Sequence, residues 1–173
     1  YTMFQKAMAL GVTGKENEKI GVLNQILTNY PSSTYKPDVY FQMAESYVKL
    51  GQQNNAITNY RRVIDDFPKS SYVKKAHLAL GLLYFNSNRN HDAINSYKKV
   101  IEDYPGTAES ENAMIGLKNV YVDMNDVDGY YSYMKNNYRY LNGSGKGMPT
   151  GISELDAAAS GLYVGGNSYC AVL

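Results

Sequence analysis

Apolar residues recur along this sequence with helical spacing, in segments that come in pairs. In the best-defined pair, apolar or small residues stand at Tyr40, Met43, Ala44 and Tyr47, and then at Ala56, Ile57, Tyr60, Val63 and Ile64. Steps of three and four residues place such positions on one face of an α-helix. The pattern therefore predicts two amphipathic helices that are joined by a turn at Gly51 and end before Pro68, which cannot continue a helix.

The same pattern recurs at an offset of 37 residues in both directions. The turn residue Gly51 is matched by Gly14 and Asn88, and Pro68 by Pro31 and Pro105. At the apolar and small positions of the pattern, the next hairpin has Leu80, Gly81, Tyr84, Ala93, Ile94, Tyr97, Val100 and Ile101. A fixed period of this size is typical of stacked helical hairpins, because one hairpin cannot bury its apolar face alone.

We therefore divide the chain into four hairpins, a linker and a partial fifth hairpin. The hairpins cover residues 1–31, 32–68, 69–105 and 106–141, the glycine-rich linker covers 142–151, and the partial hairpin covers 152–173. The first hairpin has Lys19 at the position of Ala56 and Ala93 in the next two hairpins. A larger side chain there predicts a looser crossing of its two helices. The fourth has Tyr130 at this position in a helix predicted over 127–141, although a shift of one residue would place Gly129 there instead.

Hydroxyl side chains precede the first helix of each later hairpin. We expect one of residues 32–34, Ser70 or Ser71, and Thr107 to cap these helices, because a hydroxyl oxygen can accept a hydrogen bond from a free backbone N–H. Pro37 fits the first turn of its helix, where a missing N–H costs little.

Composition and charge restrict the functions that the sequence could have. The chain has 173 residues, 44% of them hydrophobic, and a formal net charge of +1, so it creates no overall field that would attract a polyanion. His77 and His91 have no cysteine or carboxylate at metal-ligand spacing. No nucleophile, base and orienting group converge in the pattern. We expect no metal site, no catalytic residue and no cofactor, and we predict that the protein is not an enzyme.

The repeated pattern resembles the tetratricopeptide repeat. Its order is a small residue, a tyrosine, a glycine or asparagine, an alanine, a tyrosine, a valine and a proline. The resemblance implies an all-α fold, a right-handed α–α superhelix of about four hairpins plus a partial fifth. The repeat is longer than the usual 34 residues, and with its Phe-Pro and Tyr-Pro pairs it resembles the repeats of bacterial envelope proteins, such as outer-membrane assembly lipoproteins and Tol-Pal-associated proteins. That resemblance implies a periplasmic or outer-membrane-associated protein of a Gram-negative bacterium, with a cytoplasmic location as the alternative.

In this family the first helix of each hairpin lines a concave groove, and the binding residues come from that face. The resemblance places the groove at Phe4, Met8, Phe41, Glu45, Val48, Lys49, Leu78, Leu82, Phe85, Asn86, Ile115, Asn119, Val122 and Asp123. Such a groove is mostly apolar and would hold a helix or an extended peptide by hydrophobic anchors. The family's clamp for a C-terminal carboxylate needs Lys, Arg and Asn where this chain has Phe41, Leu78 and Ile115, so we do not expect that ligand.

The favoured function is a non-enzymatic scaffold that binds a protein or peptide through this groove, with no nucleic acid and no transmembrane segment. One alternative is a spacer in a longer repeat array or a self-associating module, in which these apolar residues contact neighbouring repeats or a second copy. A second alternative is RNA binding by helical repeats. We disfavour it because the basic pairs 61–62 and 98–99 are each followed by two acidic residues, which leaves the face mixed in sign.

Overall fold

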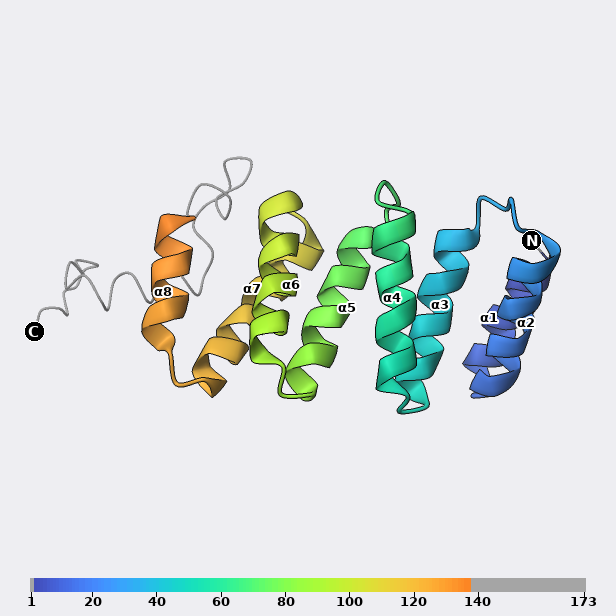
Figure 1. Cartoon of the computed structure of the whole chain (residues 1–173), viewed down its shortest axis with the longest axis horizontal. Coiled ribbons are helices and arrows are strands. Elements are labelled where there is room, and N and C mark those ends of the chain that lie inside the picture. The colour runs from blue at the N-terminus through green and yellow to red at the C-terminus, as the bar shows by residue number, and fades with distance from the viewer. Residues whose placement is uncertain (1, 138–173) are drawn as a thin grey trace, which may run out of the picture. The chain divides into compact units, whose positions relative to one another are not determined.

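The computed structural model describes residues 2–137, and this part of the chain contains eight α-helices and no strand (Figure 1). Their bounds are α1 (Thr2–Val12), α2 (Glu16–Asn29), α3 (Lys36–Lys49), α4 (Gln53–Asp66), α5 (Val73–Asn86), α6 (Asn90–Asp103), α7 (Ala108–Asp123) and α8 (Val127–Asn136). The four second helices, α2, α4, α6 and α8, begin at intervals of 37 residues. The linker and the partial fifth hairpin predicted from the sequence lie outside the described residues.

The chain divides into two compact bodies. The N-terminal body is Tyr1–Ser87, with α1 to α5, and the C-terminal body is Asn88–Leu173, in which α6, α7 and α8 are described. The division falls between the two helices of the third predicted hairpin. Within the N-terminal body α1 packs on α2, α2 on α3, α3 on α4 and α4 on α5, and within the C-terminal body α6 packs on α7 and α7 on α8.

Tight turns with a left-handed residue close the hairpins. Gly14, Gly51, Asn88 and Asn125 all have positive φ angles, of 79°, 75°, 60° and 60°. Glycine adopts this conformation without steric cost and asparagine tolerates it. The predicted turn positions are confirmed, and the fourth hairpin turns at Asn125, again 37 residues on.

The other ends of the second helices precede prolines. Tyr30, Phe67 and Tyr104 follow α2, α4 and α6 with nearly the same backbone angles, φ between −131° and −132°. A residue before proline is disfavoured in the helical conformation, so Pro31, Pro68 and Pro105 stop these helices as the sequence predicted. The last described second helix has no such proline and ends at Asn136, before residue 141, where the prediction placed its end.

The caps of the first helices follow the prediction in one case only. The Thr107 hydroxyl oxygen accepts a hydrogen bond from the Ser110 N–H at 3.1 Å, as expected for a cap. The serines before α3 and α5 are not caps. The hydroxyl oxygens of Ser33 and Ser70 accept hydrogen bonds from the N–H groups of Tyr35 and Tyr72, at 3.0 and 3.1 Å, and so hold the preceding loops.

Small residues fill the centre of the second hairpin. Ala44 and Ala56, on α3 and α4, have no exposed surface, because side chains without further atoms let two helices approach closely at their crossing. Helix α8 begins at Val127, 37 residues after the start of α6. The repeat is therefore not shifted, and the alternative with Gly129 at the position of Ala56 is wrong. Tyr130 occupies it, is buried, and lies 6.2 Å from the Tyr121 ring, centroid to centroid.

The C-terminal body has one close approach that the repeat pattern did not show. Gly116 of α7 lies against the ring of the buried Tyr97 on α6, and a Cβ atom on Gly116 would stand 2.6 Å from Tyr97 Cε1. Contacts this short force side chains or backbone to move. Gly116 therefore makes room for the tyrosine that the repeat places there.

We predict that Gly116→Ala lowers the free energy of unfolding by about 1–3 kcal/mol, because the added methyl group overlaps the Tyr97 ring. The matched control is Gly21→Ala in α2, where an added Cβ meets no atom within 4 Å. That substitution should raise stability by up to about 1 kcal/mol, since alanine is the better helix former. Urea unfolding followed by circular dichroism measures both, and equal effects of the two substitutions would contradict the prediction.

Candidate functional site

Phe41 is part of the fold of the N-terminal body. It is only 8% exposed, and its ring lies 4.8 Å from the Tyr72 ring and 5.6 Å from the Tyr60 ring. Tyr72 directly precedes α5, so the start of the next hairpin covers Phe41. Phe41, which the resemblance places in the groove, is therefore largely covered, because the aromatic residues of two hairpins meet on it.

Glu45 also contributes to the fold. One of its carboxylate oxygens accepts a hydrogen bond from the Tyr60 hydroxyl at 2.9 Å, which joins α3 to α4. Burial, and then the negative charge of Glu45, raise the pKa of the Tyr60 phenol. Glu45, which the resemblance places in the groove, therefore also stabilises the hairpin, and it is half-buried and keeps some contact with solvent.

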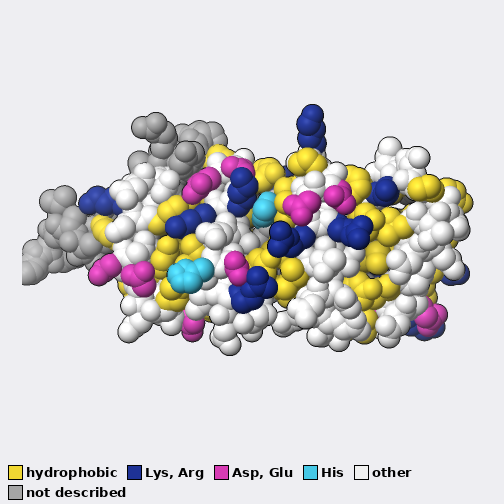
Figure 2. Space-filling model, in the orientation of Figure 1, with side chains coloured by type: hydrophobic (Ala, Val, Ile, Leu, Met, Phe, Trp, Pro, Cys, Tyr) yellow, Lys and Arg dark blue, Asp and Glu magenta, His cyan; other side chains and the backbone are white. Residues whose placement is uncertain are grey.

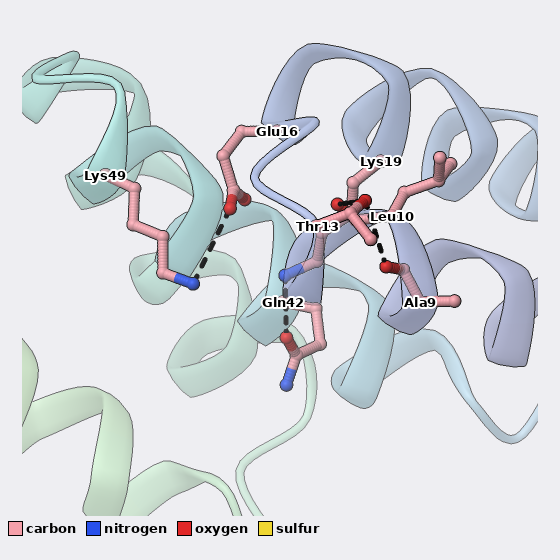
Figure 3. Close-up of polar contacts among 7 residues, drawn as sticks. All are labelled: Ala9, Leu10, Thr13, Glu16, Lys19, Gln42 and Lys49. Atoms are coloured by element: carbon pink, nitrogen blue, oxygen red, sulfur yellow. Dashed lines mark hydrogen bonds and ion pairs between the residues drawn. The ribbon is translucent and has the colours of Figure 1, made fainter.

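Lys49 belongs to a polar cluster that links the first two hairpins (Figure 3). Its Nζ atom lies 3.5 Å from a carboxylate oxygen of the buried Glu16, at the start of α2. The neighbouring Lys19 is 3% exposed and donates a hydrogen bond from Nζ to Gln42 Oε1 on α3 at 3.0 Å. The second Glu16 oxygen, Oε1, has no hydrogen-bond partner.

The structure shows how a lysine fits where other hairpins have alanine. The Lys19 stem passes over Gly11, since a Cβ atom on Gly11 would lie 3.0 Å from Lys19 Cδ. Burial lowers the pKa of the Lys19 ammonium, the charge of Glu16 opposes this, and the charge of Lys49 adds to it. Sequence reasoning found the lysine but missed its hydrogen-bond partner Gln42, because Gln42 is on α3 of the next hairpin.

The other predicted residues of the N-terminal body stay accessible. Val48 on α3 is 40% exposed and Leu82 on α5 is 54% exposed. Asn86 is exposed, and Leu78 and Phe85 are half-buried. Contiguous exposed apolar patches mark interaction sites, whereas single exposed apolar side chains are common. The accessible part of the predicted groove in this body is therefore centred on Val48 and Leu82.

The C-terminal body presents the corresponding face on α7. Ile115 and Val122, two helical turns apart, are 60% and 53% exposed, and Asn119 between them is exposed. The Asp123 carboxylate accepts a hydrogen bond of 3.4 Å from Asn90 Nδ2 at the start of α6. The accessible residues of this body thus form an apolar stripe along one helix.

The described residues carry no group of three or more histidine, cysteine or carboxylate side chains that could hold a metal ion. On the face shown in Figure 2, cationic and anionic side chains are interspersed over α4 and, in the other body, over α6. Among the helices of residues 2–137, none is long and apolar enough to cross a membrane.

An apolar pocket that sequence reasoning missed lies at one end of the first hairpin. It has a volume of about 440 Å³ and is lined by Met3, Phe4, Ile26, Tyr30 and residues 31–35. Phe4 was predicted to belong to the groove. Its ring stacks on that of Tyr35, with 6.0 Å between centroids, and forms one wall of this pocket.

The comparison with protein families identifies the repeat. The tetratricopeptide repeat model matches residues 38–70 and 75–107, so these two segments are similar to the tetratricopeptide repeat, as the resemblance predicted. Such repeats build scaffolds that typically bind proteins and are non-catalytic. A comparison with curated proteins gives no significant match.

Solved structures confirm the predicted fold class, an all-α fold of hairpins of the tetratricopeptide superhelix type. The alignment with a crystal structure of MamA covers 80% of this chain and 71% of the MamA chain, with 20% sequence identity and a TM-score of 0.64. The alignment with the Sgt2 TPR domain from Aspergillus fumigatus covers 74% of this chain and 80% of that domain, with 22% identity and a TM-score of 0.60. The alignment with a tetratricopeptide repeat protein from Parabacteroides merdae covers 79% of this chain and 51% of that protein, with 15% identity and a TM-score of 0.60.

We predict that the residues of the groove separate into two classes on substitution. Phe41→Ala should lower the free energy of unfolding by about 3–5 kcal/mol, because it removes a buried ring with two aromatic partners. Leu82→Ala should change it by less than about 0.5 kcal/mol, since an exposed side chain contributes little to folding. Urea unfolding measures both. Losses of similar size would show that Leu82 is also a core residue.

We predict that Lys19 makes stability depend on pH. Its pKa is lowered in the folded chain from 10.5, so between the two pKa values the unfolded chain binds more protons, and the stability of the folded chain rises with pH. The free energy of unfolding of the wild type minus that of Lys19→Met should therefore increase from pH 7 to pH 10. A difference that stays constant or decreases would contradict the burial of a charged Lys19.

Proposed function

We propose that this chain is a non-enzymatic protein-interaction module that holds a helix or an extended polypeptide on the apolar faces of its first helices. The observation that carries the proposal is the exposure of large apolar side chains at predicted groove positions, Val48 and Leu82 in one body and Ile115 and Val122 in the other. The same helices bury other residues in the core, among them Ala44 on α3, Ala76 on α5 and Leu117 on α7.

The energetics of these side chains support a protein ligand. Fully burying a valine, leucine or isoleucine contributes about 1.5–3 kcal/mol, so covering two half-exposed residues in each body gives a partner several kcal/mol in total. A ligand helix with apolar side chains three, four or seven residues apart can lay them on such a surface. Polar groups beside them, the exposed Asn86 and Asn119, can orient the bound chain.

The surroundings of the groove do not favour a polyanion. Lys49, a predicted groove cation, is paired with Glu16, and Lys99 on α6 is paired with Asp103 at 3.0 Å. RNA binding relies on cations that are free to replace counterions at phosphates. A polypeptide with apolar anchors fits the groove better than RNA.

In-cell photocrosslinking tests the proposal. A photoreactive phenylalanine analogue at Leu82 or at Ile115 should give discrete adducts with a protein, and adding Val48→Asp should abolish the adducts formed at Leu82. The matched control positions are Thr58 on α4 and Asn95 on α6, which are exposed on second helices and should give none. Adducts only at the control positions, or only with a second copy of this chain, would overturn the proposal, the latter in favour of a self-associating spacer.

We also propose that the module works in the envelope of a Gram-negative bacterium, in the periplasm or at the outer membrane. The support is the 37-residue repeat, which is similar to the longer repeats of envelope proteins. Fractionation of cells that express the full-length protein from its own gene tests this, with a periplasmic and a cytoplasmic protein as markers. Recovery with the cytoplasmic marker would overturn the location without affecting the binding function.

A further inference from the structure

The positions that line the pocket of the first hairpin have equivalents in the second hairpin. Comparison of the two shows which side chains the first hairpin lacks. The repeat offset of 37 residues pairs Phe4 with Phe41, Tyr30 with Phe67 and Tyr35 with Tyr72. Three walls of the pocket are therefore aromatic in both hairpins. The chain thus offers its own reference for how this space is filled.

The backbone around the two positions is the same. Tyr30 and Phe67 have φ angles of −132° and ψ angles of 64° and 59°. The loops that follow are held by equivalent hydrogen bonds, in which the Ser33 and Ser70 hydroxyl oxygens accept the N–H groups two residues later. The pocket in the first hairpin is therefore due to side chains and not to a different loop.

Two tyrosine rings of the second hairpin are missing from the first. Tyr40 corresponds to Met3, and Tyr60 corresponds to Leu23. The Tyr40 ring lies 6.1 Å from the Phe67 ring, centroid to centroid, and the Tyr60 ring packs edge-on against Phe41 at 5.6 Å. Met3 lines the open pocket where the Tyr40 ring would stand in the repeat.

The aromatic walls of the first hairpin are correspondingly uncovered. Tyr30 is 56% exposed, whereas Phe67 is half-buried, and Phe4 is half-buried, whereas Phe41 is buried. Tyr35 is exposed and Tyr72 is half-buried. Tyr30 and Phe4 thus lack the additional ring that packs against Phe67 and Phe41.

We propose that this pocket binds an aromatic side chain of a protein partner, with the ring in the space that Tyr40 occupies in the second hairpin. The proposal rests on the proposed function, because it takes the ligand to be a polypeptide, and it names the chemistry of one anchor. Aromatic rings prefer offset or edge-on contacts with other rings at centroid distances of about 4.5–7 Å. The Tyr40 ring has such a contact with Phe67, and Tyr30, the counterpart of Phe67, lines the pocket beside Phe4 and Tyr35. The lining residues include no charged side chain, so a neutral ring fits better than a charged group.

Nuclear magnetic resonance of the whole chain tests the proposal, with N-acetyl-L-phenylalaninamide as the probe. We expect saturable shifts confined to the amides of residues 3–4 and 30–35, with a dissociation constant of the order of a millimolar, as is usual for a ligand of this size. The matched probe is N-acetyl-L-cyclohexylalaninamide, which has a similar shape and no π-system, and it should bind about 3-fold or more weakly. Absence of saturable shifts, or equal binding of both probes, would overturn the proposal.

Two variants and a control locate the binding. Met3→Tyr supplies the ring that the second hairpin has, and it should abolish binding of the probe without unfolding the chain. Tyr30→Ala removes a largely exposed wall and should weaken binding 3-fold or more. Leu82→Asp should leave binding of the probe unchanged, so a loss of crosslinks at the groove and a loss of this pocket are distinguishable. Unchanged binding to both pocket variants would overturn the assignment.

Discussion

The close packing of two short helices, repeated at a constant interval, is the constraint on which the rest of this structure depends. Each hairpin needs a left-handed turn residue and a compact crossing, and the chain supplies the turn at Gly14, Gly51, Asn88 and Asn125. Such a hairpin has an apolar face that it cannot bury by itself. Successive helices therefore pack on one another within each body. The faces of the first helices that this packing does not cover stay exposed.

The crossings show how much variation this constraint permits. The simplest crossing is that of the second hairpin, where the small, fully buried side chains of Ala44 and Ala56 let the two helices approach closely. At the position of Ala56, the first hairpin has a lysine, for whose stem Gly11 leaves room. Gln42 accepts a hydrogen bond from its ammonium, and the negative charge of Glu16 favours the charged form. In the fourth hairpin a buried tyrosine occupies the same position. In the first hairpin, close packing is kept because Gly11 on the neighbouring helix leaves room for the lysine.

The same variation separates structural residues from accessible ones along the groove. Phe41, Leu78 and Ile115 share one position of the repeat, yet Phe41 is buried, Leu78 is half-buried and Ile115 is 60% exposed. The burial of Phe41 comes from the rings of Tyr60 and Tyr72, on the following helix and at the start of the next hairpin. A position in the repeat therefore does not by itself say whether a side chain is available to a ligand.

The sequence by itself determined the hairpins, their turns and their period, because these follow from local rules, and the family resemblance then gave the face on which a ligand is expected. Apolar spacing, left-handed glycine or asparagine and proline stops act within a few residues of one another. The tertiary structure decided which groove residues are accessible, how Lys19 is buried, why Gly116 faces Tyr97, and where the first hairpin has a pocket. These depend on side chains from different helices that meet in space, for which the sequence carries no local signal.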